Sequence, residues 1–108
     1  MATDKSTLEY FLELLSDIPD LHAKAMFGEY GIYSGEKMFA LACDNTLFFK
    51  TFPETVGLFE DTETKAYPGS KNTAPMNADW IENREELTKV ALLTISFAPI
   101  PKAKKRKC

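Results

Sequence analysis

The chain has 108 residues, of which 44% are hydrophobic and 27% are charged, and its net charge is −3. This length and composition are typical of one soluble globular domain, with no room for a second core. No apolar run approaches the ~18 residues that a membrane span needs. The polar, acidic N-terminus is unlike a signal peptide, so we expect no membrane association.

The two cysteines, Cys43 inside a strand pattern and Cys108 at the terminus, do not make a disulfide framework, which favours a reducing, cytoplasmic location. The charge is distributed unevenly. Five of the 13 basic residues fall in residues 102–107, so 8 remain in residues 1–101 against all 16 acidic residues, a net charge of −8 there. We therefore predict an acidic domain over residues 1–98 and a disordered Pro/Lys-rich basic tail over residues 99–108.

A first helix is predicted from apolar residues at helical spacing. These residues are Leu8, Phe11, Leu12, Leu15 and Ile18. Ser6 and Glu9 have the spacing of a capping box, and Pro19 ends the helix. Tyr10 and Leu14 widen the apolar stripe beyond what one core contact requires.

Three strands follow, over residues 26–34, 37–44 and 47–51, joined by short turns that favour an antiparallel meander. Alternation in the middle strand places Phe39, Leu41 and Cys43 on one face and Met38, Ala40 and Ala42 on the other. Residues 54–60 are expected to form a short helix after Pro53 that buries Val56, Leu58 and Phe59. Two short edge strands are expected about a turn at residues 69–72.

A last helix is predicted to begin at a cap, Asn83, with Glu85 and Glu86 in its first turn. Its apolar positions are Leu87, Val90, Ala91, Thr94 and Phe97, and further apolar residues lie on its other faces. The element order α-β-β-β-α-β-β-α indicates an α+β two-layer fold, an antiparallel sheet with helices on one face.

The segments MFGEYGIYSGEKMFAL (residues 26–41) and LFFK (residues 47–50) resemble the N-terminal domain of the TfoX/Sxy competence-regulator family. The family pattern is roughly RxMFGGYGIYxxGxMFAL…LYLK. The matching residues are Met26, Phe27, Gly28, Tyr30, Gly31, Tyr33, Gly35, Met38, Phe39, Leu41, Phe49 and Lys50. Glu29 occupies the position where the family has a second glycine, and Lys24 is the one basic residue where the family often has a basic pair before the motif.

The resemblance implies a fold like that of type III secretion chaperones, which is often dimeric. It also implies a bacterial origin and an association with the regulation of natural transformation. Within this framework the matching residues are expected to shape and fill the sheet.

Few residues suggest chemistry. His22 is the only histidine and has no predictable partner or companion metal ligand, so we expect a boundary histidine. Cys43 lies in an apolar strand pattern and is expected to be buried, whereas Cys108 is expected to be exposed and oxidisable. Nothing in the sequence makes Glu29 and Asp44 an acid–base pair, and a turn is the simpler role for Asp44.

Two binding hypotheses also arise from the motif. The glycines of residues 28–35 precede a strand rather than a helix N-terminus, so backbone shaping is favoured over phosphate binding. The aromatic side chains could stack on bases, but such platforms have basic neighbours, and this region has few. Packing in the core or at an interface is the preferred interpretation.

The basic tail is the strongest candidate for contact with nucleic acid. Its charged residues are Lys102, Lys104, Lys105, Arg106 and Lys107. Five charges would give a log–log salt slope of roughly −4 to −5. The acidic domain opposes such binding, so a solvated tail is favoured and a nucleic-acid contact stays an alternative.

The sequence therefore predicts a non-enzymatic regulatory or protein-interaction module with no cofactor and no metal. We expect a homodimer and a protein partner such as a transcription regulator. The alternatives are a chaperone-like carrier of peptides or proteins and a nucleic-acid accessory factor that uses the tail. An enzyme is the least favoured class because no nucleophile–base pair or cofactor loop is evident.

Overall fold

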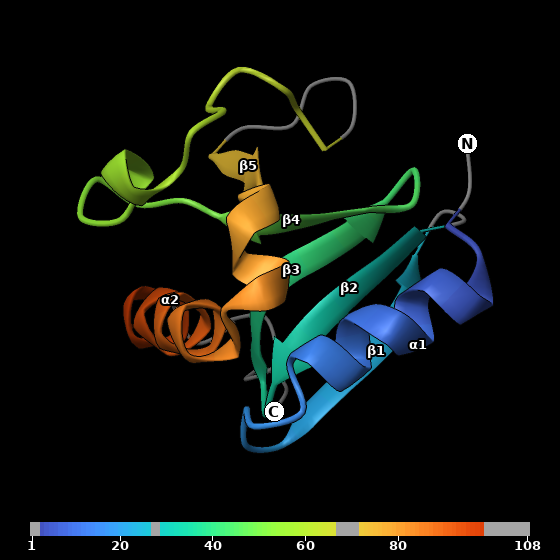
Figure 1. The fold of residues 1–108 in the computed structure, drawn as a ribbon. Helices are drawn as coiled ribbons and strands as arrows, with labels where there is room; N and C mark the ends of the chain where they lie inside the picture. Colours follow the sequence, from blue (N-terminus) through green and yellow to red (C-terminus); the bar gives the residue numbers. More distant parts are fainter. Residues whose placement is uncertain (1–2, 27–28, 67–71, 99–108) are drawn as a thin grey trace, which may run out of the picture.

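The computed structural model of the protein describes residues 3–26, 29–66 and 72–98. Two helices and five strands form its framework, with two short 3₁₀ segments between them (Figure 1). In chain order the elements are α1 (Lys5–Leu14), β1 (Leu21–Met26), β2 (Glu29–Ser34), β3 (Lys37–Cys43), β4 (Thr46–Lys50), η1 (Val56–Leu58), β5 (Thr73–Pro75), η2 (Ala78–Glu82) and α2 (Arg84–Phe97).

The strands form one antiparallel sheet in the order β1-β2-β3-β4-β5. Consecutive strands are therefore neighbours, as the short turns in the sequence predict. The β2–β3 turn contains Gly35 at φ 63°, and the β3–β4 turn contains Asp44 and Asn45 at φ 52° and 58°. Two central residues with positive φ make the second turn a tight hairpin connection whose twist matches that of the strands.

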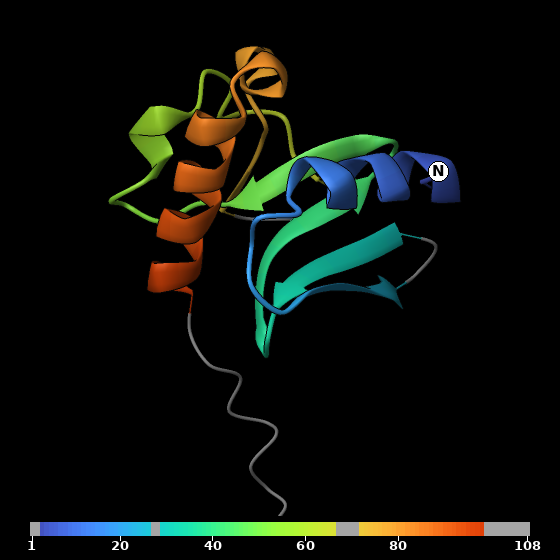
Figure 2. The ribbon, with the colours of Figure 1, turned by 60° about the horizontal axis from the view of Figure 1, so that its bottom comes forward.

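Both helices pack on the same face of the sheet, which confirms the two-layer α+β arrangement. Figure 2 shows α1 lying across the sheet and α2 running beside it toward β3 and β4. The core between the layers joins both helices to alternate strand residues. Its fully buried members include Leu15, Ile32, Phe39, Phe49 and Leu87.

A β-bulge in β3 overturns the predicted faces of that strand. Ile32 pairs with Ala40 and Tyr33 pairs with Met38, so Phe39 is an extra residue without an opposite partner. A bulge shifts the alternation of side chains by one position. Phe39 consequently joins Ala40 in the core under the helices, and its expected grouping with Leu41 and Cys43 is wrong.

The other face of the sheet carries a second, smaller cluster. Leu41, Cys43 and Phe48 are buried there together with Ala66, and Met38 packs at its margin. Ala66 belongs to the long connection between η1 and β5, so this connection covers part of the face opposite the helices.

The structure also corrects several predicted boundaries. The strand expected at residues 26–34 is preceded by a separate strand, β1, which the sequence analysis missed. Helix α1 begins at Lys5 after Asp4, whose side chain makes no capping hydrogen bond, so the predicted Ser6–Glu9 capping box is wrong. The cap of α2 is confirmed, because the Asn83 side chain accepts a hydrogen bond from the backbone N–H of Glu86 at 3.2 Å.

The segment between β4 and α2 differs most from expectation. The helix predicted at 54–60 is only the 3₁₀ turn η1. Of the three apolar side chains expected to be buried there, Val56 and Leu58 are exposed, and Phe59, which follows η1, is buried. Of the two expected edge strands, β5 is present, and the predicted turn at residues 69–72 lies largely outside the described residues. Helix η2 was not predicted, and it buries Trp80 against Phe49 and Phe59. No helix within the described ranges has the length and apolar character to cross a membrane.

Candidate functional site

The aromatic residues of the family motif are mainly core residues. Phe39 and Phe49 lie with ring centroids 6.2 Å apart, and Phe49 also contacts Phe59 and Trp80 at 6.0 and 6.1 Å. Tyr30 packs at the margin of the same core. Rings at these separations stabilise each other in tilted or offset arrangements, so these side chains hold the layers together.

The remaining motif residues serve the strands, the turns and the opposite face. Gly35 occupies a left-handed backbone conformation that L-residues with a Cβ rarely adopt. Leu41 and Met38 belong to the smaller cluster, and Lys50 ends β4, where it pairs with Thr73. Gly31 is buried within β2. Phe27 and Gly28 lie outside the described residues, and Met26 ends β1.

Cys43 is buried in the cluster opposite the helices, as expected. Burial raises the pKa of its thiol from an ordinary value of 9.0 to about 11, and the negative charges of Glu29 and Asp44 add to the rise. A reactive cysteine needs the opposite environment, one that stabilises a thiolate. At neutral pH this thiol is protonated and acts as a small apolar side chain.

Glu29 holds the N-terminal segment against the β3–β4 turn. Its Oε1 accepts hydrogen bonds from the Thr3 hydroxyl at 2.7 Å and from the Asp44 backbone N–H at 3.1 Å. The Thr3 hydroxyl also accepts a bond from the Asn45 N–H, and the Asn45 side chain accepts one from the Asp4 N–H. Glu29 and Asp44 thus meet through a backbone bond, which is a structural contact.

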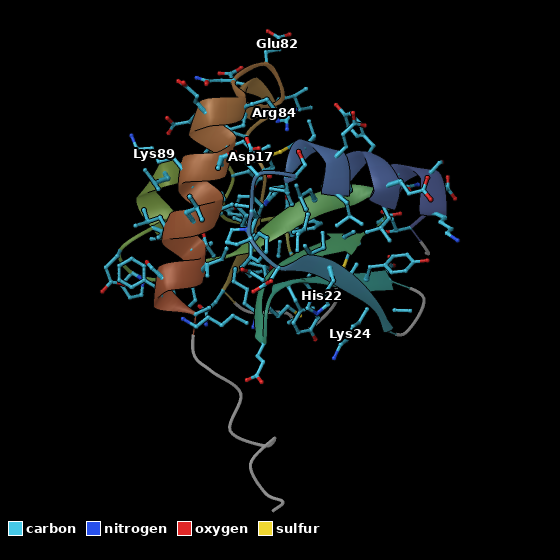
Figure 3. The ribbon with its side chains drawn as sticks, turned by 90° about the horizontal axis from the view of Figure 1, so that it is seen from below. Asp17, His22, Lys24, Glu82, Arg84 and Lys89 are labelled. Atoms are coloured by element: carbon cyan, nitrogen blue, oxygen red, sulfur yellow. The ribbon has the colours of Figure 1, made fainter. Side chains whose placement is uncertain are left out.

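His22 lies in β1 and is exposed. Its ring stacks on that of Tyr33, its partner across the strands, with centroids 5.2 Å apart and planes 6° from parallel. The Lys24 ammonium lies 5.2 Å from the centre of the same Tyr33 ring. Tyr33 therefore orders both side chains on the face opposite the helices, and Figure 3 shows them near each other.

A shallow hollow of about 370 Å³ lies between the end of α1 and the first half of α2. Asp17, Arg84 and Lys89, labelled in Figure 3, contribute to its lining. The Arg84 guanidinium is already engaged, because it donates hydrogen bonds to the Glu13 carbonyl and the Ser16 hydroxyl at 3.1 Å each. The hollow therefore lies where these hydrogen bonds join the end of α1 to the beginning of α2.

Helix α2 exposes large apolar side chains, of which Leu92 lines the hollow beside α1, and Leu93 and Phe97 form what we call the outer face of α2. Leu92, Leu93 and Phe97 are 44%, 38% and 38% exposed, although Phe97 was predicted to be a core position. Phe97 contacts only the half-buried ring of Phe52 among the described aromatics, at 6.1 Å. On α1, by contrast, Leu14 is buried and Tyr10 alone extends the stripe into solvent. Of the two α-helices, α2 therefore exposes more apolar side chains among the described residues.

The tail residues predicted to contact nucleic acid, Lys102, Lys104, Lys105, Arg106 and Lys107, lie outside the described residues, as does Cys108. Within the described ranges, no three His, Cys, Asp or Glu side chains gather in a way that could hold a metal ion. The Glu29 contacts and the Tyr33 stack were not identified from sequence, because each depends on strand register. The wide apolar stripe of the last helix was predicted, but which of its side chains stay exposed depends on helix packing.

These features define a class: a small α+β domain whose motif residues build a scaffold and whose last helix exposes apolar side chains. Comparison with known proteins identifies the family. The TfoX N-terminal domain model matches residues 13–98. The chain is also 30% identical over 108 residues to an "uncharacterized 12.7 kDa protein in trpE 5′region" of Spirochaeta aurantia, and the match covers 99% of this chain and 93% of that protein. The chain belongs to the TfoX N-terminal domain family.

Proposed function

We propose that the protein is a non-enzymatic regulatory module that works by binding other proteins, and that it does so as a homodimer joined through the outer face of α2. Membership of the TfoX N-terminal domain family supports a regulatory role connected with competence. The observation that carries the proposal is the exposure of Leu93 and Phe97, which lie one turn apart on the outer face of α2. Exposed apolar side chains that gather on one surface are typical of interaction sites.

A second copy of the chain suits this face. Lys89, Leu93 and Phe97 follow one another at intervals of four and so form one row along the helix. If two α2 helices cross in opposite directions about Leu93, each Leu93 meets its copy and each Lys89 meets the other copy's Phe97. The row is therefore self-complementary, as a two-fold interface requires, and a cation over an aromatic ring is a favourable contact.

We call the proposed interface between two copies, through the outer face of α2, the α2 seam. It would leave other surfaces free for a protein partner such as a transcription regulator. Helix α2 packs against β3 and β4, whereas β1 lies at the edge of the sheet. The sheet face opposite the helices lies on the other side of the sheet from α2. A dimer of this kind would present two copies of each surface, and paired sites raise the effective affinity for a partner that is itself repeated.

The experiment is a mass measurement by size-exclusion chromatography with light scattering over a range of concentrations. The unmodified protein is expected to approach twice the 12.2 kDa chain mass at high concentration. Leu93→Glu is expected to hold it at the monomer mass because a carboxylate would lie in the seam.

Leu58→Glu is the matched control. Leu58 is 39% exposed, much like Leu93, but lies on η1. The same substitution there is expected to leave the dimer intact. A monomer mass for the unmodified protein at all concentrations, or equal effects of both variants, would contradict the α2 seam.

A further inference from the structure

Strand β1 forms one edge of the sheet. All six of its residues pair with β2, from Leu21 opposite Ser34 to Met26 opposite Glu29. Among the described strands, none pairs with its other side. At six residues it is also twice the length of β5 at the opposite edge. A long, open edge is a template on which another extended chain can add.

The register shows which backbone groups face outward. The Gly35 N–H donates a hydrogen bond to the Asp20 carbonyl at 3.0 Å, just beyond the last β1–β2 pair. Hydrogen-bonded and non-hydrogen-bonded pairs alternate along antiparallel strands. The backbone groups of His22 and Lys24 therefore bond to β2, and those of Leu21, Ala23 and Ala25 point away from the sheet.

One positively charged side chain, Lys24, lies next to this edge, beside the imidazole of His22. His22 and Lys24 share the face opposite the helices, both are exposed, and the Tyr33 ring orders both. Ala23 and Ala25 alternate with them and are small, so they leave the edge accessible. This is a local exception, because the described parts of the chain are acidic overall.

We propose that the β1 edge binds an extended acidic peptide segment, which adds as a further strand and places carboxylates at alternate positions beside His22 and Lys24. The inference rests on the proposed protein-binding function and names the chemistry of one partner. Backbone hydrogen bonds to Leu21, Ala23 and Ala25 would supply affinity, and the Lys24 ammonium would select acidic sequences.

A second copy of the chain fits this edge less well. In one of the two longest symmetric antiparallel registers that keep both cores on one side, Lys24 lies opposite Lys24 of the other copy. Like charges directly opposite each other destabilise a strand pair. A carboxylate at the same position converts that repulsion into attraction.

The first test titrates the ¹⁵N-labelled protein with three blocked peptides, TVEVEVT, TVQVQVT and TVKVKVT, and follows amide shifts. We expect TVEVEVT to bind most tightly and to shift the amides of Leu21, Ala23 and Ala25. Lys24→Glu is expected to weaken TVEVEVT by at least about fivefold and to make TVKVKVT the preferred peptide. Lys65→Glu, at an exposed position outside the sheet, is the matched control and should change neither affinity.

The second test removes one outward donor from the backbone. Ala23→Pro deletes an N–H that bonds to nothing in β2, so it should preserve the fold, as checked by circular dichroism and the melting temperature, and abolish TVEVEVT binding. Equal binding of all three peptides, or unchanged binding by folded Ala23→Pro, would overturn the proposal.

The two proposals fail separately. If no peptide binds but the α2 dimer forms, the edge proposal is wrong and the dimeric module stands. If instead a concentration-dependent dimer is lost in Ala23→Pro and retained in Leu93→Glu, then β1 joins two copies, and both the acidic partner and the α2 seam are refuted.

Discussion

At the scale of single residues, Cys43 links burial to ionisation. Its thiol is 2% exposed and has a pKa raised to about 11, whereas in the unfolded chain the pKa returns to about 9.0. Above pH 9 the unfolded state loses its thiol proton before the folded state does. The contribution of this group to stability is therefore complete below pH 9 and disappears as the pH rises toward 11.

We expect the free energy of unfolding to fall more steeply between pH 9 and pH 11 for the unmodified protein than for Cys43→Ala. Urea unfolding at several pH values measures the difference between the two, which cancels the titration of lysine and tyrosine side chains common to both. Parallel pH profiles would show that the environment of Cys43 does not disfavour the thiolate.

Glu29 provides a second prediction at this scale. Because its Oε1 accepts two hydrogen bonds, Glu29→Ala should lower the free energy of unfolding by about 1–2 kcal/mol. Glu29→Gln keeps an acceptor oxygen and should cost less than about 0.5 kcal/mol. Chemical denaturation measures both changes. An alanine variant as stable as the glutamine variant would remove the structural role assigned to this carboxylate.

At the scale of elements, the beginning of α2 depends on one side chain. The Asn83 side chain accepts a hydrogen bond from the Glu86 N–H, and Glu85 and Glu86 lie in the first turn of the helix. Asn83→Ala should lower the free energy of unfolding by about 1 kcal/mol. Asn83→Asp, which retains a capping oxygen, should leave it nearly unchanged. Thermal and urea unfolding of the two variants test this, and equal losses in both would show that the cap is unimportant.

Elements that are determined by residues adjacent in sequence could be predicted, whereas those that depend on distant residues could not. The cap of α2, the Gly35 turn and the meander order were all predicted, since each is fixed by residues adjacent in sequence. The bulge at Phe39 was missed because it arises from the register between β2 and β3. Strand β1 was missed because LHAKAM has small and charged residues in place of a strong apolar alternation.

The surfaces were less predictable than the framework. The sequence showed that α1 and α2 both carry wide apolar stripes, but only the packing shows that Leu14 is covered and that Leu92 and Leu93 are not. The His22–Tyr33–Lys24 arrangement likewise depends on the pairing of β1 with β2. A binding surface is made by elements distant in sequence, and local patterns do not report it.

At the scale of the whole molecule, the two surfaces that carry the proposals lie on different parts of the fold. Helix α2 packs against β3, β4 and η2, whereas β1 is the edge strand of the sheet, beyond β2 (Figures 1 and 2). A dimer through α2 therefore leaves both β1 edges open. If both proposals hold, the dimer would present two β1 edges to extended peptide segments.

If two copies meet through α2 at Leu93, as we propose, then the variant Leu93→Cys should form an interchain disulfide. Cys108 is replaced by serine so that it cannot cross-link, and Leu58→Cys in the same background is the control. Under mild oxidation we expect a covalent dimer of about twice 12.2 kDa for Leu93→Cys and a monomer for Leu58→Cys on non-reducing gels. A monomer for both variants, or the same yield of dimer from both, would show that two copies do not meet at Leu93.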